Sequence, residues 1–118
     1  YSPVQHLDGL KRTVEEILQR HQVNYSLEWY LSGEPFYTPP GRLSGAVGAA
    51  VRTVTGHDPQ LSTGGGTSDG RFIAPMGAEV VELGVVGASI HKVNECVRVE
   101  DVDGLHAIYL QVLRNLLA

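Results

Sequence analysis

The sequence feature that most constrains this chain is a run of glycines near its centre. Gly64, Gly65, Gly66 and Gly70 fall close together between apolar segments. Because glycine loses the most conformational entropy on ordering and leaves no side chain to pack, this stretch favours neither a helix nor a strand. It offers bare backbone N–H groups, so it is either a plain tight turn or a loop that binds an anion such as phosphate or a carboxylate. The glycine spacing matches neither the P-loop nor the dinucleotide-binding motif.

Length and composition place the chain among ordinary globular proteins. It has 118 residues, enough for one domain or for parts of two, and 42% of them are hydrophobic. The net charge of −4 comes with no basic stripe, so we expect no nucleic-acid partner. No apolar run approaches the length of a membrane span, so we expect no membrane partner.

The cysteine content and the first residues bear on where the chain works. The single cysteine, Cys96, rules out an internal disulfide and fits a reducing compartment. The opening residues lack the basic and apolar regions of a signal peptide, so we expect a cytoplasmic location. The chain begins with Tyr1 rather than methionine, and helical periodicity begins almost at once, at Leu7. We therefore expect a piece cut from a longer protein.

Apolar residues at helical spacing predict three amphipathic helices. The first begins at Leu7 and ends near His21, and the second follows Gly41 and is closed by Gly56 as its left-handed C-terminal residue. The last begins near Asp101, a favourable N-cap residue type. Small residues in the second helix predict close packing against a sheet.

Two other stretches have the character of strands. Residues 23–31 alternate apolar and polar side chains, which indicates a strand with one buried face. Residues 79–86 are rich in β-branched side chains, which is typical of a strand buried on both faces. Residues 71–74 are short enough for a helical turn or a strand, stopped by Pro75. Residues 33–41 are dense in proline and glycine, so we place an organisational boundary there.

The residues that bear chemistry are few, and spacing alone leaves each of them open. His91 lies in a polar stretch and is either a solvated loop histidine or a metal ligand. Arg71 either pairs with nearby Asp69 or binds a carboxylate ligand. Cys96 precedes an apolar run and is expected to be a buried, inert thiol rather than a nucleophile. The sequence contains no HxxxH, HxH or CxxC pattern, so spacing does not predict a complete metal site.

Two long motifs identify a family. Residues 61–74, LSTGGGTSDGRFIA, and residues 90–95, IHKVNE, resemble the C-terminal part of the succinyl-diaminopimelate desuccinylase family, a branch of the dinuclear zinc aminoacylase and carboxypeptidase superfamily. Residues 31–36, LSGEPF, resemble the point where such enzymes return from a lid domain to the catalytic domain. The resemblance covers essentially the whole chain.

The resemblance implies a fold class and a domain division. The fold is expected to be α/β. Residues 1–38 are expected to be the last helix and strand of an α+β lid, or dimerisation, domain. Residues 39–118 are expected to be the C-terminal part of a zinc-peptidase-like catalytic domain. The same resemblance implies a homodimer. An unpaired apolar strand recruits partners, so we also expect self-association through residues 23–31.

The resemblance also implies roles for single residues. His91 matches a ligand of one of two zinc ions, for which cobalt is expected to substitute. Gly66, Thr67 and Ser32 match substrate contacts. Asp69 and Arg71 are expected to support the glycine-rich loop. The family usually has an asparagine where this chain has Gly87, so that substrate contact is expected to be lost.

The implied reaction is hydrolysis of N-succinyl-LL-2,6-diaminopimelate to succinate and LL-diaminopimelate, a step in the biosynthesis of diaminopimelate and lysine. The bridging aspartate, the general-base glutamate and the other zinc ligands of the family do not occur here. The chain alone is therefore expected to be inactive and to bind no zinc tightly. The alternatives are a related deacylase of the acetylornithine deacetylase type, a non-catalytic interaction module, and an anion-binding domain that uses residues 64–70.

Overall fold

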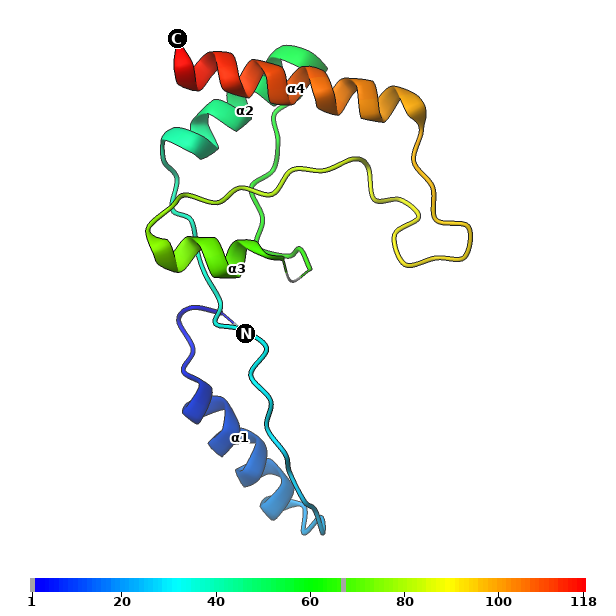
Figure 1. Ribbon diagram of the computed structural model, residues 1–118. Coiled ribbons are helices and arrows are strands. Elements are labelled where there is room, and N and C mark those ends of the chain that lie inside the picture. Colours follow the sequence, from blue (N-terminus) through cyan, green and yellow to red (C-terminus); the bar gives the residue numbers. More distant parts are fainter. Residues whose placement is uncertain (1, 67) are drawn as a thin grey trace.

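The computed structural model describes residues 2–66 and 68–118. The described chain forms four α-helices and one short 3₁₀ helix (Figure 1). Their bounds, in chain order, are α1 Leu7–Arg20, α2 Arg42–Thr55, α3 Gly70–Ile73, η1 Ala74–Met76 and α4 Val99–Leu117. Among these helices, none combines the length and the apolar character that a membrane crossing requires.

The core lies between α2 and α4, which cross each other at one end of the molecule (Figure 1). Ala50 of α2 is fully buried, and Ile108 and Val112 of α4 are each 7% exposed. Partly buried apolar side chains surround these three: Leu43, Val47, Val51, Leu83 and Leu116. The small side chain of Ala50 lets the two helix backbones approach closely. The expected packing of this helix against a sheet is not confirmed, because in the described chain α2 packs on the helix α4.

Polar contacts between distant parts of the chain hold α2 against α4. The Arg42 guanidinium donates to the carbonyl oxygen of Leu116 at 2.5 Å, at the C-terminal end of α4. The Asn115 amide donates to the carbonyl oxygen of Ala46 at 3.1 Å. The Tyr109 hydroxyl donates to the carbonyl oxygen of Leu83 at 2.8 Å, which ties residues 79–86 to the same helix.

The helix α1 and residues 23–31 form a separate arm (Figure 1). Residues 23–31 turn back along α1, where the Lys11 ammonium lies 5.8 Å from the centre of the Trp29 ring. No residue of α1 is buried. The arm therefore has an amphipathic helix and an alternating segment but no hydrophobic core of its own.

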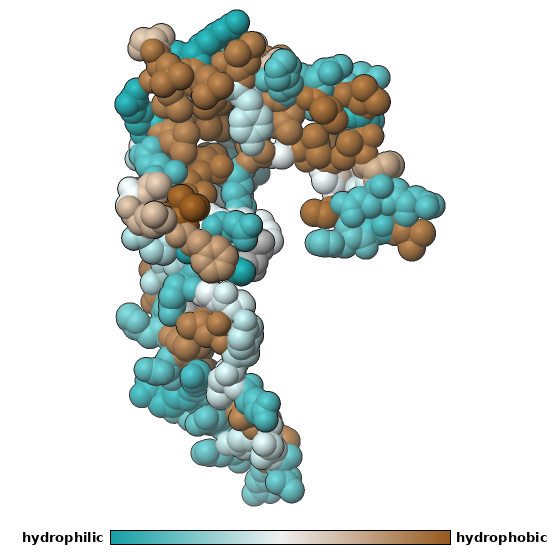
Figure 2. Space-filling model, in the orientation of Figure 1, coloured by the Kyte–Doolittle hydropathy of each residue, from teal (hydrophilic) through white to brown (hydrophobic). Residues whose placement is uncertain are grey.

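The whole chain is much more open than a compact domain. Its accessible surface is 9453 Å², whereas a compact monomer of this mass would expose about 6,300 Å². Its radius of gyration is 19.1 Å, against about 13.5 Å for a compact chain of this length. Hydrophobic side chains gather over α2 and α4, whereas the arm is largely hydrophilic (Figure 2).

The helix predictions are confirmed, with one shift. The first two helices have the expected bounds, and Gly56 closes α2 with a left-handed φ of 75°. The last begins at Val99 rather than near Asp101. We expected Pro75 to end the helical turn at residue 74, and it does not. A proline near the start of a helical turn needs no N–H donor, so the 3₁₀ helix η1 includes Pro75.

The strand predictions are not confirmed. The described chain contains no β-strand, so only the helical half of the expected α/β architecture is present. Residues 23–31 are exposed throughout, without the buried face that we expected. The expectation that residues 79–86 are buried on both faces is wrong, since Val86 is 60% exposed. The physical reason is that a strand exists only when a partner supplies its hydrogen bonds, and neither segment has one.

Candidate functional site

His91 lies on a loop between residues 79–86 and α4 that projects away from the helical core (Figure 1). Two backbone hydrogen bonds shape the start of the loop, from Ile90 N–H to the Gly87 carbonyl at 3.2 Å and from Lys92 N–H to the Ser89 carbonyl at 3.0 Å. The Lys92 ammonium also donates to the Ala88 carbonyl at 2.8 Å. His91 itself is exposed, as a residue that contacts a metal or a substrate from outside the chain must be.

The backbone of this loop is unusual at two positions. His91 and Asn94 both have a φ of 60°, in the left-handed region that favours glycine. The left-handed conformation costs a residue with a side chain about 1–2 kcal/mol. Histidine and asparagine visit this region more often than most residues do. The loop is therefore held by the contacts around it rather than by the preference of these two residues.

Ser89 supplies a contact that closes this loop. Its hydroxyl donates to the Cys96 carbonyl at 2.7 Å and accepts a hydrogen bond from the Cys96 N–H at 3.0 Å. The two bonds join the start and the end of the loop across His91. Ser89 could not be identified from the sequence, because a serine in a polar stretch does not indicate a contact with a residue seven positions away.

The described residues do not assemble a metal site. In residues 2–66 and 68–118, no group of three or more histidine, cysteine, aspartate or glutamate side chains converges. A catalytic zinc needs about three protein ligands. His91 is thus a single candidate ligand, and a zinc ion bound there would need its other ligands from elsewhere.

The glycine-rich loop is exposed from Gly64 to Gly66. The Gly64 N–H donates to the Ser62 hydroxyl at 3.0 Å, so one of the N–H groups that an anion would need is already bonded. A Cβ added to Gly65 would lie 3.8 Å from the Glu82 carboxylate, which places a negative charge beside the loop. Both observations disfavour a phosphate cradle. Thr67 lies outside the described residues.

Arg71 links residues 31–36 to the end of the glycine-rich loop. A Cβ added to Gly33 would lie 2.7 Å from Cδ of Arg71, so the arginine stem packs on the bare backbone beside Ser32. The guanidinium carbon is 4.7 Å from the centre of the Phe72 ring. The Nε atom of Arg71 is buried and has no hydrogen-bond partner among the described residues. The structure therefore brings Arg71 close to Ser32.

Asp69 does not pair with Arg71. Ion pairs form elsewhere in the chain, between Arg52 and Asp58 and between Arg98 and Asp101. Asp69 instead precedes α3, and its carbonyl accepts a hydrogen bond from the Phe72 N–H at 3.0 Å. Gly70 is required next to it, since a Cβ there would come within 2.8 Å of the Val80 side chain. This close contact seats the end of the glycine-rich loop on residues 79–86.

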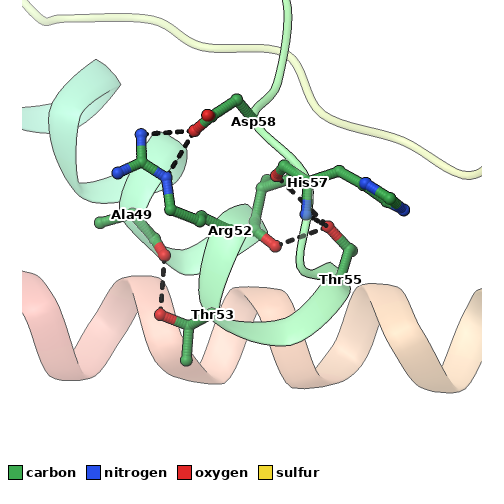
Figure 3. Close-up of polar contacts among 7 residues, drawn as sticks. Ala49, Arg52, Thr53, Thr55, His57 and Asp58 are labelled. Carbon is green, nitrogen blue, oxygen red and sulfur yellow. Dashed lines mark hydrogen bonds and ion pairs between the residues drawn. The ribbon is translucent and has the colours of Figure 1, made fainter.

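Polar contacts fix the turn that leads from α2 to the glycine-rich loop (Figure 3). The Arg52 Nε donates to the Asp58 carboxylate at 2.5 Å. The Thr55 hydroxyl accepts a hydrogen bond from the His57 N–H at 3.2 Å, and the His57 ring points away from the Arg52–Asp58 pair. His57 thus contributes its backbone to the turn, and its imidazole takes no part in these contacts.

An arginine and a carboxylate form an ion pair at the start of α4. The Arg98 guanidinium contacts the Asp101 carboxylate at 2.6 and 3.1 Å. This hydrogen bonding lowers the pKa of Asp101 and raises the pKa of Arg98. The pair follows directly on the His91 loop and fixes the direction in which α4 leaves it.

Known proteins resemble the chain over almost its whole length. The sequence profile of peptidase family M20/M25/M40 matches residues 3–115. A succinyl-diaminopimelate desuccinylase of Marinobacter nauticus is 58% identical over 94% of the chain, and one of Nitrosococcus oceani is 60% identical over 92%. One of Acinetobacter baylyi is 55% identical over the entire chain. The chain spans about 30% of the length of these curated relatives.

Proposed function

The chain belongs to peptidase family M20/M25/M40, and from this we propose that it is the C-terminal part of a succinyl-diaminopimelate desuccinylase. The complete enzyme would hydrolyse the amide bond of N-succinyl-LL-2,6-diaminopimelate to give succinate and LL-diaminopimelate. The observation that carries the proposal is the identity of 53–60% to desuccinylases across at least 92% of the chain. Identity of this extent favours a shared substrate over a shared fold alone.

Within that enzyme, His91 is proposed to ligate one of two zinc ions, for which cobalt would substitute. Its exposure on a projecting loop supports this role, because the remaining ligands would approach from outside the described residues. The described residues do not by themselves complete a zinc site, and we assign no catalytic step to the chain alone.

Substrate contacts are proposed at Gly66, Thr67 and Ser32. The position of Arg71 supports this assignment for Ser32. The aliphatic part of the Arg71 side chain packs on Gly33 and so holds residues 31–36 against α3. Arg71 and Asp69 are proposed as supports of the glycine-rich loop. For Asp69 the support would come from its backbone carbonyl, which accepts the Phe72 N–H, rather than from its carboxylate.

The domain division follows from the same proposal. Residues 1–38 would end a lid or dimerisation domain, and residues 39–118 would end the catalytic domain. In the complete protein, residues 23–31 and 79–86 would gain the partner strands that they lack here. An extended segment without partners also favours homodimerisation, or self-association of the isolated chain, through residues 23–31. The Cys96 thiol is exposed, so the expectation that it is buried is wrong; an exposed free thiol is compatible with a cytoplasmic location.

The test uses the longer protein that contains this chain. The purified enzyme is assayed for succinate release, and its zinc content is measured. We expect hydrolysis in the parent enzyme, and we expect His91→Ala to abolish it together with about one zinc per subunit. His57→Ala is the matched control, because His57 contributes only its backbone to its turn. An active His91→Ala enzyme with full zinc content would refute the assignment of His91.

Two alternatives are separated by the same preparation. A deacylase of the acetylornithine type would release acetate from acetylornithine faster than succinate from the succinylated substrate. The unpartnered residues 23–31 favour a non-catalytic interaction module. Such a module would release neither acetate nor succinate, whether the 118-residue chain or the longer protein is assayed.

A further inference from the structure

We propose that Ser89 is a positioning residue for His91: its hydroxyl bonds both backbone polar groups of Cys96 and thereby fixes the loop that presents the imidazole. The inference rests on the proposed function, since it matters for activity only if His91 acts at the metal. It goes beyond that function, because it assigns a role to a residue outside the candidate ligands and substrate contacts.

The geometry distinguishes Ser89 from the other contacts in the loop. The bonds from Ile90 to Gly87 and from Lys92 to Ser89 each span three positions, so they shape local turns only. The Lys92 ammonium bonds Ala88, again within the same turn. In the described part of the loop, the Ser89 hydroxyl makes the only side-chain bonds that reach across His91 to the far end, with O···O and N···O distances of 2.7 and 3.0 Å.

The backbone at His91 needs such a closure. A φ of 60° is disfavoured for any residue with a side chain, so an unrestrained loop would return His91 to ordinary conformations. Such a change would redirect the imidazole. The paired bonds at Cys96 oppose it, because they hold the two ends of the loop together while Asn94, with the same φ, turns the chain back.

Removing the hydroxyl should change the loop and leave the core intact. Ser89 and Cys96 are far in the chain from Ala50, Ile108 and Val112, and Cys96 is exposed, so water can replace the lost bonds at its backbone. Ser89→Ala is therefore the informative variant. Ser89→Thr is its matched control, because threonine keeps a hydroxyl on the same carbon.

The first measurement is amide hydrogen exchange by NMR in the 118-residue chain. In Ser89→Ala we expect the Cys96 amide to exchange at least about tenfold faster and the His91 ring resonances to shift, with the amides of α2 and α4 unchanged. Ser89→Thr should restore both signals to near the parent values. Unchanged exchange at Cys96 overturns the proposal, and so does faster exchange that leaves the His91 resonances in place.

The second measurement is a kcat-against-KM split in the longer enzyme. Misplacing a group by about 1 Å can cost on the order of 100-fold in rate, so we expect Ser89→Ala to lower kcat by at least about tenfold. KM should stay within about twofold, and Ser89→Thr should recover most of kcat. An equal loss in both variants, or a change confined to KM, overturns the proposal. An active His91→Ala enzyme would refute the proposed role of His91 instead, and it would leave the exchange result at Cys96 standing.

Discussion

Among the described residues, three other than glycine adopt left-handed backbone conformations: Gln22, His91 and Asn94. Each marks a place where the surrounding contacts override local preference. Gln22 ends α1 in a Schellman arrangement. Its N–H donates to the Gln19 carbonyl, and the Val23 N–H donates to the Leu18 carbonyl, both at 3.0 Å. Glycine is the preferred residue at this position of the motif, and glutamine there carries the cost of its Cβ.

Gln22→Gly should therefore stabilise the end of α1. Relief of the left-handed strain is worth about 1 kcal/mol, which would slow amide exchange in the last turn of α1 roughly fivefold. Gln22→Ala keeps the Cβ and is the control, in which no such slowing is expected. Faster exchange in the glycine variant would show that the φ of 54° is not a source of strain.

The Arg98–Asp101 pair predicts a pH dependence at the start of α4. Arg98 lowers the pKa of Asp101 in the folded chain, so the pair stabilises the helix above the unfolded-state pKa of about 3.9. This contribution is lost as the pH falls through the lowered value. An NMR titration of the Asp101 carboxyl should give a pKa below the usual range, and Arg98→Gln should raise it. A pKa unaffected by Arg98→Gln would exclude the pair as the cause.

At the scale of the elements, the helices were predictable because their signals are local. The spacing of Leu7, Leu10 and Val14 shows the periodicity of α1, and the left-handed Gly56 marks the end of α2. The strand predictions failed because pairing is not local. Residues 23–31 have the right alternation, but alternation supplies no partner for their backbone groups.

Some features of the candidate site could be proposed from the sequence, and others could not. His91 could be proposed as a site residue from the sequence because its motif resembles a known family. The contact between Ser89 and Cys96 could not be predicted, because neither residue type indicates a hydrogen bond between positions seven residues apart. The packing of Arg71 on Gly33 joins residues far apart in sequence and likewise left no local signal.

The contact between α2 and α4 depends on the absence of bulk at Ala50. Ala50→Leu would force a larger side chain into a fully buried position, and overpacking of this kind costs about 1–3 kcal/mol. We expect the variant to lose helical content at a lower denaturant concentration, as followed by circular dichroism. Ala49→Leu introduces the same side chain at an exposed neighbouring position and should have little effect. Equal stability of the two variants would mean that α2 and α4 do not pack in this way.

At the scale of the whole molecule, the core is too small for the surface it leaves exposed. Buried apolar side chains are limited, within the described residues, to Ala50, Ile108 and Val112. The exposed area exceeds that expected of a compact monomer of this mass by about half. We expect such a chain to bury more of its surface by associating with other copies. The extended residues 23–31 have unpaired backbone groups that a second copy could bind.

We therefore expect the isolated chain to self-associate at tens of micromolar, as measured by light scattering. Leu27→Lys places a charge on the apolar side of this segment and should shift the population toward monomer. Ser26→Lys adds the same charge at a polar position and should leave the association intact. A monomeric parent chain at this concentration would contradict the expectation.

The central claim is that this chain contributes a single metal-binding imidazole and a substrate-facing loop to a site whose other ligands lie outside its described residues. The most direct test is the zinc content of the purified 118-residue chain after dialysis against metal-free buffer, with succinate release measured on the same sample. The claim predicts far less than one zinc per chain and no hydrolysis. Tight binding of one or more zinc ions per chain, together with release of succinate, would contradict it.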